Sequence, residues 1–161
     1  TRQADIGIFM RKPKRLNYIQ KKLVDIKYHI YGSNRYLEKY GIPKNINDLN
    51  KHRFISFGKG APSPVFNPDW ALKLGVKDNK KRKPVMKVNS VMGLLLAVES
   101  GVGLAALPEY LVSNSTNVIK VLPDSAGPIT EAHFVYPESL KNVARVKAFR
   151  NFLYSKIGDW K

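Results

Sequence analysis

The chain has 161 residues, no cysteine, and 28 Lys and Arg against 12 Asp and Glu, which gives a formal net charge of +16. Its length fits one domain or two small lobes, and 43% hydrophobic residues exclude an intrinsically disordered chain. Without cysteine there is no disulfide, thiolate metal site or cysteine nucleophile. The longest apolar run, residues 91–98, is too short to span a bilayer, and no signal peptide opens the chain.

The positive charge is concentrated in the first half. Residues 1–87 hold 21 basic and 6 acidic side chains, whereas residues 88–161 hold 7 and 6. The densest cluster comprises Lys80, Lys81, Arg82 and Lys83, and a second occupies residues 11–15. Such runs indicate either a solvated lysine-rich surface or a contact with a polyanion. If the second interpretation holds, we expect Lys80, Lys81, Arg82 and Lys83 to bind nucleic acid weakly and without sequence preference.

The first half predicts three strands, a short helix, and a turn or single helical turn at residues 47–49. Residues 4–9 predict a buried strand, residues 14–23 a polar loop, and the alternation in residues 25–31 a half-buried strand. Ser33 is expected to cap a helix through Tyr40, which Gly41 and Pro43 end. A strand follows at residues 53–57, then a loop at residues 58–64 with two Gly and two Pro.

The second half alternates helices and strands. A helix is predicted to start at residues 67–72, followed by a charged turn at 78–83 and a strand at 85–88. Asn89 or Ser90 is expected to cap the strongest helix, and Gly101 to end it. Strands are predicted at residues 102–107, 118–122 and 129–136, a short helix from Pro108, and an amphipathic C-terminal helix from Val143. This order predicts an α/β sheet with parallel connections, which binds ligands where strands end and helices begin.

No catalytic constellation is visible. The histidines His29, His52 and His133 have no Ser or Asp at a known motif spacing, and the carboxylates are scattered. The glycines Gly101 and Gly103 follow a helix, whereas a nucleotide-binding fingerprint precedes one. We therefore expect a binding module with no catalytic residues, no metal site and no cofactor.

Several segments carry a family resemblance. They are Ala4-Asp5-Ile6-Gly7-Ile8, residues 36–43 with Asp48-Leu49, Val88-Asn89-Ser90, residues 97–110, Phe134-Val135-Tyr136-Pro137 and residues 146–153. In this order the chain resembles the effector-binding domain of LysR-type transcriptional regulators, over nearly its whole length. Residues 97–108 are the most specific part.

The resemblance implies a type 2 periplasmic-binding-protein-like α/β fold, with two Rossmann-like lobes and a hinge of crossing strands. Residues 1–10 and 130–161 would be pieces of lobe I, which is then incomplete, and residues 11–129 would form lobe II. It also implies a cytoplasmic bacterial homo-oligomer that binds a small-molecule effector between lobes to modulate transcription. DNA would be contacted through a winged helix-turn-helix domain outside this chain, and no membrane would be involved.

The resemblance and the ends of the predicted strands give a candidate effector site. We expect it to be lined by Phe9, Met10, Phe57, Gly58, Pro64, Val65, Phe66, Asn89 and Ser90. Backbone N–H groups at the start of a helix favour a carboxylate, so Asn89 and Ser90 fit an anionic ligand group. The alternative interpretation is a helix cap beside a loop with packed aromatic side chains.

Three other functions remain open from the sequence. A periplasmic-type solute-binding protein has the same fold, an enzyme on a similar fold would need a catalytic set, and a basic nucleic-acid-binding protein would use the charge. A recognition helix and interleaved aromatic and basic residues are missing, which disfavours the last as the main function.

Overall fold

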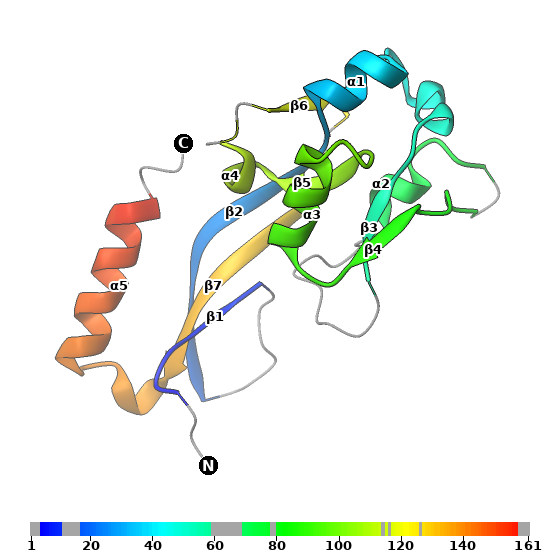
Figure 1. The fold of residues 1–161 in the computed structure, drawn as a ribbon. Coiled ribbons are helices and arrows are strands. Elements are labelled where there is room, and N and C mark those ends of the chain that lie inside the picture. Colours follow the sequence, from blue (N-terminus) through cyan, green and yellow to red (C-terminus); the bar gives the residue numbers. More distant parts are fainter. Residues whose placement is uncertain are drawn as a thin grey trace. The chain divides into compact units, whose positions relative to one another are not determined.

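The computed structural model describes residues 4–10, 17–58, 69–77, 80–113, 115, 117–125 and 127–157. They form two compact units (Figure 1). Unit 1 contains the described residues up to Ile26 and those from Thr130 onward, and unit 2 runs from Lys27 to Ile129. The first boundary falls inside strand β2 (Tyr18–Ser33), later than the expected position after residue 10, because this long strand contributes to both units.

Unit 1 is built around strand β7 (Ile129–Pro137), which lies between β1 (Gly7–Phe9) and β2 in the sheet. Strands β1 and β7 are antiparallel, with Phe9 opposite His133. The 3-10 helix η2 (Glu138–Leu140) and helix α5 (Ala144–Ile157) follow. The core of this unit consists of Phe134, Tyr136, Leu140 and Val146, packed against Ile6, Ile19, Leu23, Val143 and Leu153.

Two expectations for unit 1 are wrong. The strand expected to be buried at residues 4–9 is reduced to β1, where Ile8 and Phe9 are 49% and 47% exposed because β1 is an edge strand. The loop expected at residues 14–23 is a strand from Tyr18 onward. Ile19 and Leu23 reach the core while the lysines between them are exposed, so the polar composition concealed a strand.

The sheet of unit 2 has β2 at its centre. Strand β5 (Ala105–Pro108) and strand β6 (Val118–Val121) both pair antiparallel with β2. Strands β3 (Ile55–Phe57) and β4 (Met86–Val88) are parallel, and the bridge between Phe54 and Leu104 joins them to β5, also in parallel. The parallel sheet expected from the sequence is therefore confirmed for β4, β3 and β5 only.

Helices cover both faces of this sheet. Helix α1 (Asn34–Tyr40), the 3-10 helix η1 (Ile46–Lys51) and helix α2 (Trp70–Lys73) share a buried cluster with Ile30, Phe54 and Leu104. Helix α3 (Val91–Glu99) and helix α4 (Glu109–Val112) share another with the adjacent residues, Tyr31, Ile55 and Ala105. Because successive strand residues point to opposite faces, the two clusters lie on opposite sides of the sheet.

The helix ends follow the sequence signals. Ser33 caps α1 by accepting a hydrogen bond from the Tyr36 N–H, and Gly41 ends it with a φ of 84°. Gly101 follows α3 with a φ of 76°, as its place in the most specific segment predicts. Within the described residues, no helix combines the length and apolar character needed to cross a membrane.

Candidate functional site

Three parallel strands of unit 2 end at the same edge of the sheet. Strand β3 ends at Phe57 and β4 at Val88, and β5 passes through Pro108 directly into Glu109 of α4. Helix α3 also begins at this edge, since Asn89 and Ser90 connect it to β4. We call the group Phe57, Gly58, Asn89, Ser90 and Glu109 the carboxyl edge. In α/β sheets, ligands bind outside such strand ends.

Backbone pairing brings the two halves of the carboxyl edge together. Phe57 is opposite Val88, and the Gly58 N–H donates a 2.7 Å hydrogen bond to the Val88 carbonyl oxygen. Gly58 therefore lies beside the segment that leads into α3. Phe57 is half-buried and packs against the core under α3, so its aromatic ring is anchored.

Ser90, and not Asn89, caps α3. The Ser90 hydroxyl oxygen accepts a 3.3 Å hydrogen bond from the Gly93 N–H, and the Ser90 carbonyl accepts one from the Leu94 N–H. The N–H groups of Val91 and Met92 lie in the first turn, where a helix offers them no acceptor. With the partial positive charge of the helix N-terminus, they suit an anionic ligand group, and exposed Asn89 flanks them.

The other predicted effector-site residues are placed as follows. Phe9 ends β1 in unit 1, and Met10 follows it and is half-buried. Pro64, Val65 and Phe66 lie outside the described residues. Of the predicted residues, the structure thus brings together Phe57, Gly58, Asn89 and Ser90.

A charged trio at the carboxyl edge was missed by the sequence analysis. One carboxylate oxygen of Glu109 accepts a 2.6 Å hydrogen bond from Lys120 Nζ. The same oxygen lies 3.1 Å from His29 Nε2. The hydrogen bond from Lys120 lowers the pKa of Glu109, and burial lowers the pKa of His29. The three residues come from α4, β6 and β2, so no sequence spacing connects them, and only the sheet pairing reveals the trio.

This trio predicts a loss of stability in mild acid. Because the pKa of His29 is lower in the folded chain than its ordinary value of about 6.5, the unfolded chain binds the proton first as pH falls. The free energy of unfolding should therefore decrease from about pH 7 to about pH 5. Glu109, whose pKa is also lowered, adds a further loss at more acidic pH.

Urea unfolding at a series of pH values checks this expectation. The substitution His29→Asn should flatten the decrease between about pH 7 and 5, since it removes one of the protons taken up. His52 has a pKa lowered by burial as well, so His29→Asn with His52→Asn should flatten it further. A slope unchanged by either variant would show that these histidines titrate alike in both states.

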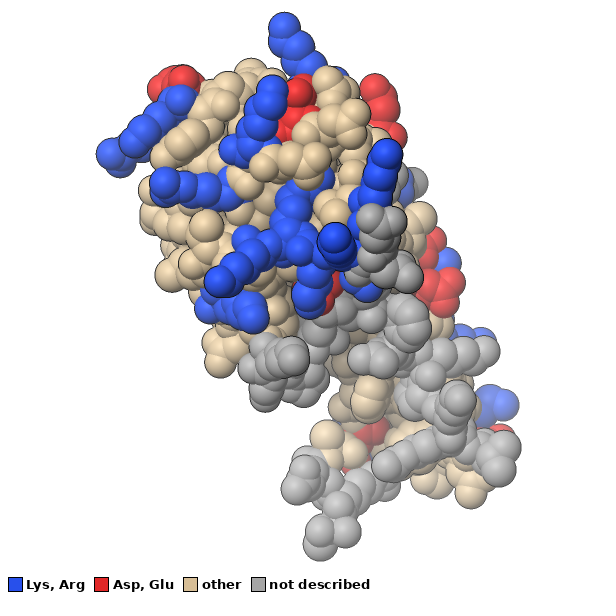
Figure 2. All heavy atoms as spheres, turned by 90° about the vertical axis from the view of Figure 1, so that its right-hand side faces the viewer, with Lys and Arg blue, Asp and Glu red and all other residues tan. Residues whose placement is uncertain are grey.

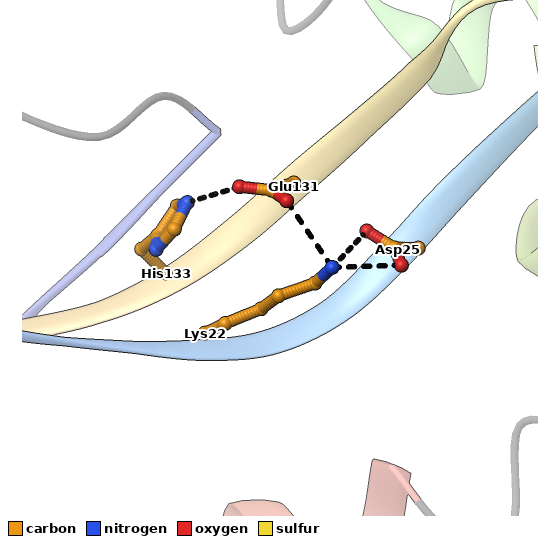
Figure 3. A network of polar contacts seen from close by, with 4 residues as sticks. All are labelled: Lys22, Asp25, Glu131 and His133. Atoms are coloured by element: carbon orange, nitrogen blue, oxygen red, sulfur yellow. Dashed lines mark hydrogen bonds and ion pairs between the residues drawn. The ribbon is translucent and has the colours of Figure 1, made fainter.

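A second polar network lies in unit 1 and joins β2 to β7 (Figure 3). Lys22 Nζ is 2.8 Å from Asp25 and 3.1 Å from Glu131, and Glu131 is 3.1 Å from His133 Nε2. The hydrogen bonds that Lys22 donates to Asp25 and Glu131 raise the pKa of Lys22, and the one to Glu131 lowers the pKa of that carboxyl. The lysine and both carboxylates are exposed, so the network fixes strand alignment more than it stabilises the fold.

The described residues contain no group of three or more His, Asp or Glu side chains arranged to hold a metal ion. The carboxyl edge offers backbone N–H donors, an amide, a hydroxyl, the carboxylate of Glu109 and an anchored aromatic ring.

Two comparisons by sequence identify the class of protein. The family model described as the LysR substrate binding domain matches residues 1–157. An uncharacterized HTH-type transcriptional regulator of Haemophilus influenzae is 29% identical over 124 residues, covering 74% of this chain and 41% of the relative. The HTH-type transcriptional regulator CrgA of Neisseria meningitidis is 25% identical over 146 residues, covering 86% and 46%.

Solved structures share the fold. The regulatory domain of CrgA from Neisseria meningitidis superposes with a TM-score of 0.80 at 22% identity, covering 96% of this chain and 76% of that domain. Full-length LysG from Corynebacterium glutamicum, with bound effector Arg, gives a TM-score of 0.67 at 16% identity, covering 95% and 50%.

The fold and the family match together define an α/β substrate-binding domain. The chain belongs to the LysR substrate-binding-domain family. It spans less than half the length of the curated relatives described above. Those relatives are transcriptional regulators, which agrees with the expectation of a module that is not an enzyme.

Proposed function

We propose that this chain is the effector-sensing part of a LysR-type transcriptional regulator and that the carboxyl edge holds the anionic group of a small effector. The observation that carries the proposal is the junction of Gly58 with the start of α3, where backbone N–H groups, Asn89 and Phe57 come together. A carboxylate can accept from the N–H groups while its apolar part rests against an aromatic ring.

A neighbouring structure supports the choice of ligand class. LysG, which has the same fold, holds the amino acid arginine as its effector, and an amino acid carries a carboxylate. The matches to HTH-type transcriptional regulators favour a regulator over a solute-binding protein of the same fold.

In the intact regulator the effector would act by differential affinity. If it binds one arrangement of a homo-oligomer more tightly than another, it shifts the population between DNA-binding states. The DNA would be bound by a winged helix-turn-helix domain outside this chain.

The test is a screen of the 161-residue chain against amino acids, aromatic carboxylates and short dicarboxylates, read by amide NMR shifts. Ligands that bind should shift the amides of Gly58, Asn89, Val91 and Met92. If the carboxylates that bind leave all these amides unmoved, the assignment of the site is wrong.

A charge substitution at the cap sharpens the test. Ser90→Asp keeps a side chain that can cap α3, so stability should change by less than about 0.5 kcal/mol. It places a negative charge where the carboxylate would lie, and we expect binding to weaken by at least about 10-fold, or about 1.4 kcal/mol. Ser155→Asp, on exposed α5 in unit 1, is the matched control and should leave affinity unchanged. If the parent chain, Ser90→Asp and Ser155→Asp bound the ligand with equal affinity, the placement of the carboxylate at the start of α3 would be wrong.

A further inference from the structure

The two helical layers of unit 2 differ sharply in charge. From Val91 to Ser113, which covers α3 and α4, the chain has Glu99 and Glu109 and no Lys or Arg. The opposite layer, with α1, η1, α2 and the segment after α2, has three described acidic residues, Glu38, Asp48 and Asp69. Its described basic residues are Arg35, Lys39, Lys44, Lys51, Arg53, Lys73, Lys77, Lys80, Lys81, Arg82 and Lys83.

Figure 2 looks onto the side of unit 2 where α2, β3 and β4 lie in Figure 1, and it shows Lys and Arg side chains gathered there. Basic residues that are spread along a sequence need not lie close together in space. In this fold, the basic residues of this layer lie on one surface.

Arg82 is the residue that assembles this surface. Its guanidinium donates to Asn50 Oδ1 at 2.7 and 3.0 Å and to the Leu74 carbonyl oxygen at 2.8 Å. Its backbone N–H donates to the Leu72 carbonyl oxygen at 2.9 Å. These contacts tie η1, α2 and residues 80–83 together. The sequence predicts that Arg82 contacts nucleic acid together with its neighbours; in the structure its guanidinium donors form hydrogen bonds within the fold.

The lysines around Arg82 remain exposed. We call Lys51, Lys73, Lys77, Lys80 and Lys83 the lysine face. Lys81 lies 2.6 Å from Asp69, so its charge is largely matched. Lys51 is 3.8 Å from Asp48 and 82% exposed. Among the described residues, none forms an ion pair with Lys73, Lys77, Lys80 or Lys83.

We propose that the lysine face binds the phosphate backbone of duplex DNA directly, in addition to any contact made by a separate DNA-binding domain. This goes beyond the proposed function, because it assigns a DNA contact to the sensing domain itself. Exposed lysines such as Lys73, Lys77, Lys80 and Lys83, which form no ion pair within the described residues, are mobile point charges, and these suit phosphates rather than base edges. The contact should therefore be independent of sequence.

Duplex DNA fits this surface better than a single strand does. Single-strand sites place aromatic rings among the basic residues so that bases stack on them. No aromatic residue occurs among the described residues 71–83, which carry four of the five lysines of the face. Charge alone can recognise the regular phosphate spacing of a duplex.

The experiment is a salt titration of the 161-residue chain with two unrelated duplexes, read by fluorescence anisotropy. The first variant combines Lys73→Gln, Lys77→Gln, Lys80→Gln and Lys83→Gln. The matched control removes the same charge from unit 1 with Lys21→Gln, Lys141→Gln, Lys147→Gln and Lys156→Gln, all at exposed positions. A single strand and vesicles of phosphatidylcholine with phosphatidylserine are the competing probes.

We expect equal affinity for the two duplexes and, if four phosphates are neutralised, a decrease of roughly 100-fold between about 50 and 200 mM salt. The lysine-face variant should bind more than about 10-fold more weakly and with a shallower salt dependence, whereas the control should stay close to the parent chain.

Three results would overturn the proposal: no duplex binding at low salt, equal loss in both variants, or stronger binding to the single strand or the vesicles than to the duplex. The effector screen has an independent readout, the amide shifts at the carboxyl edge. The lysine face can therefore fail while effector binding holds, and the reverse is equally distinguishable.

Discussion

Replacing Gly103 with alanine is expected to lower the free energy of unfolding by about 3 kcal/mol. A Cβ atom at this position would lie 2.7 Å from the Arg53 carbonyl oxygen and 3.0 Å from its carbonyl carbon. Both are backbone atoms two residues before β3, and the Leu104 N–H donates to the same oxygen at 2.8 Å. The methyl group can be admitted only if β3 and β5 separate, which breaks the junction between the two parts of the unit 2 sheet.

Gly93→Ala is the matched control for this substitution. A Cβ at Gly93 would meet Ser90 and Val88 at 3.6 and 3.7 Å, which are ordinary van der Waals distances. Since Gly93 lies inside helix α3, alanine should stabilise the chain by about 0.5 kcal/mol. Urea unfolding measures the stability of both variants. If the Gly103→Ala protein were as stable as the parent chain, the backbone between β3 and β5 could shift at little cost and the prediction would be wrong.

Arg82→Ala is expected to cost about 2–3 kcal/mol, because the guanidinium makes charged hydrogen bonds to Asn50 and Leu74 that no other group replaces. The guanidinium carbon of Arg82 also lies 5.4 Å from the centre of the Phe54 ring, so a cation–π contact is lost as well. For a chain of this size the midpoint of thermal unfolding should fall by roughly 4–12 °C.

Two variants separate geometry from charge at this position. Arg82→Lys keeps the charge but lacks the planar fork, and we expect it to recover less than half of the loss. Lys83→Ala removes the neighbouring exposed lysine and should change stability by less than about 0.5 kcal/mol. If Arg82→Ala were as mild as Lys83→Ala, Arg82 would not hold the three segments together.

Local signals in the sequence predicted local structure well. The caps at Ser33 and Ser90 and the helix ends at Gly41 and Gly101 are all confirmed, because each depends on a few neighbouring residues. At the candidate site, the end of β3 and the start of α3 lie side by side through the hydrogen bond from Gly58 to Val88. The family resemblance implied this proximity, and no local signal did.

Features that depend on long-range pairing could not be predicted. The first half of β2 carries polar residues, and only its neighbour β7, far along the chain, makes it a strand. The trio of His29, Glu109 and Lys120 forms only once β2, β6 and α4 have been brought together. Arg82 stood in a run of four basic residues, and nothing local distinguished the one whose charge is used inside the fold.

The length of β2 makes this stretch of sequence unusually intolerant of insertions and deletions. Ile19 and Leu23 at one end of the strand face the core of unit 1, and Ile30 and Tyr31 at the other end face the two cores of unit 2. Side chains along a strand alternate between the two faces of the sheet. One added residue near the middle of β2 would therefore move every side chain on one side of the insertion to the opposite face. A single-codon gain or loss here would therefore damage one core or the other. In natural variants of this gene, we expect length changes to be absent from residues 18–33.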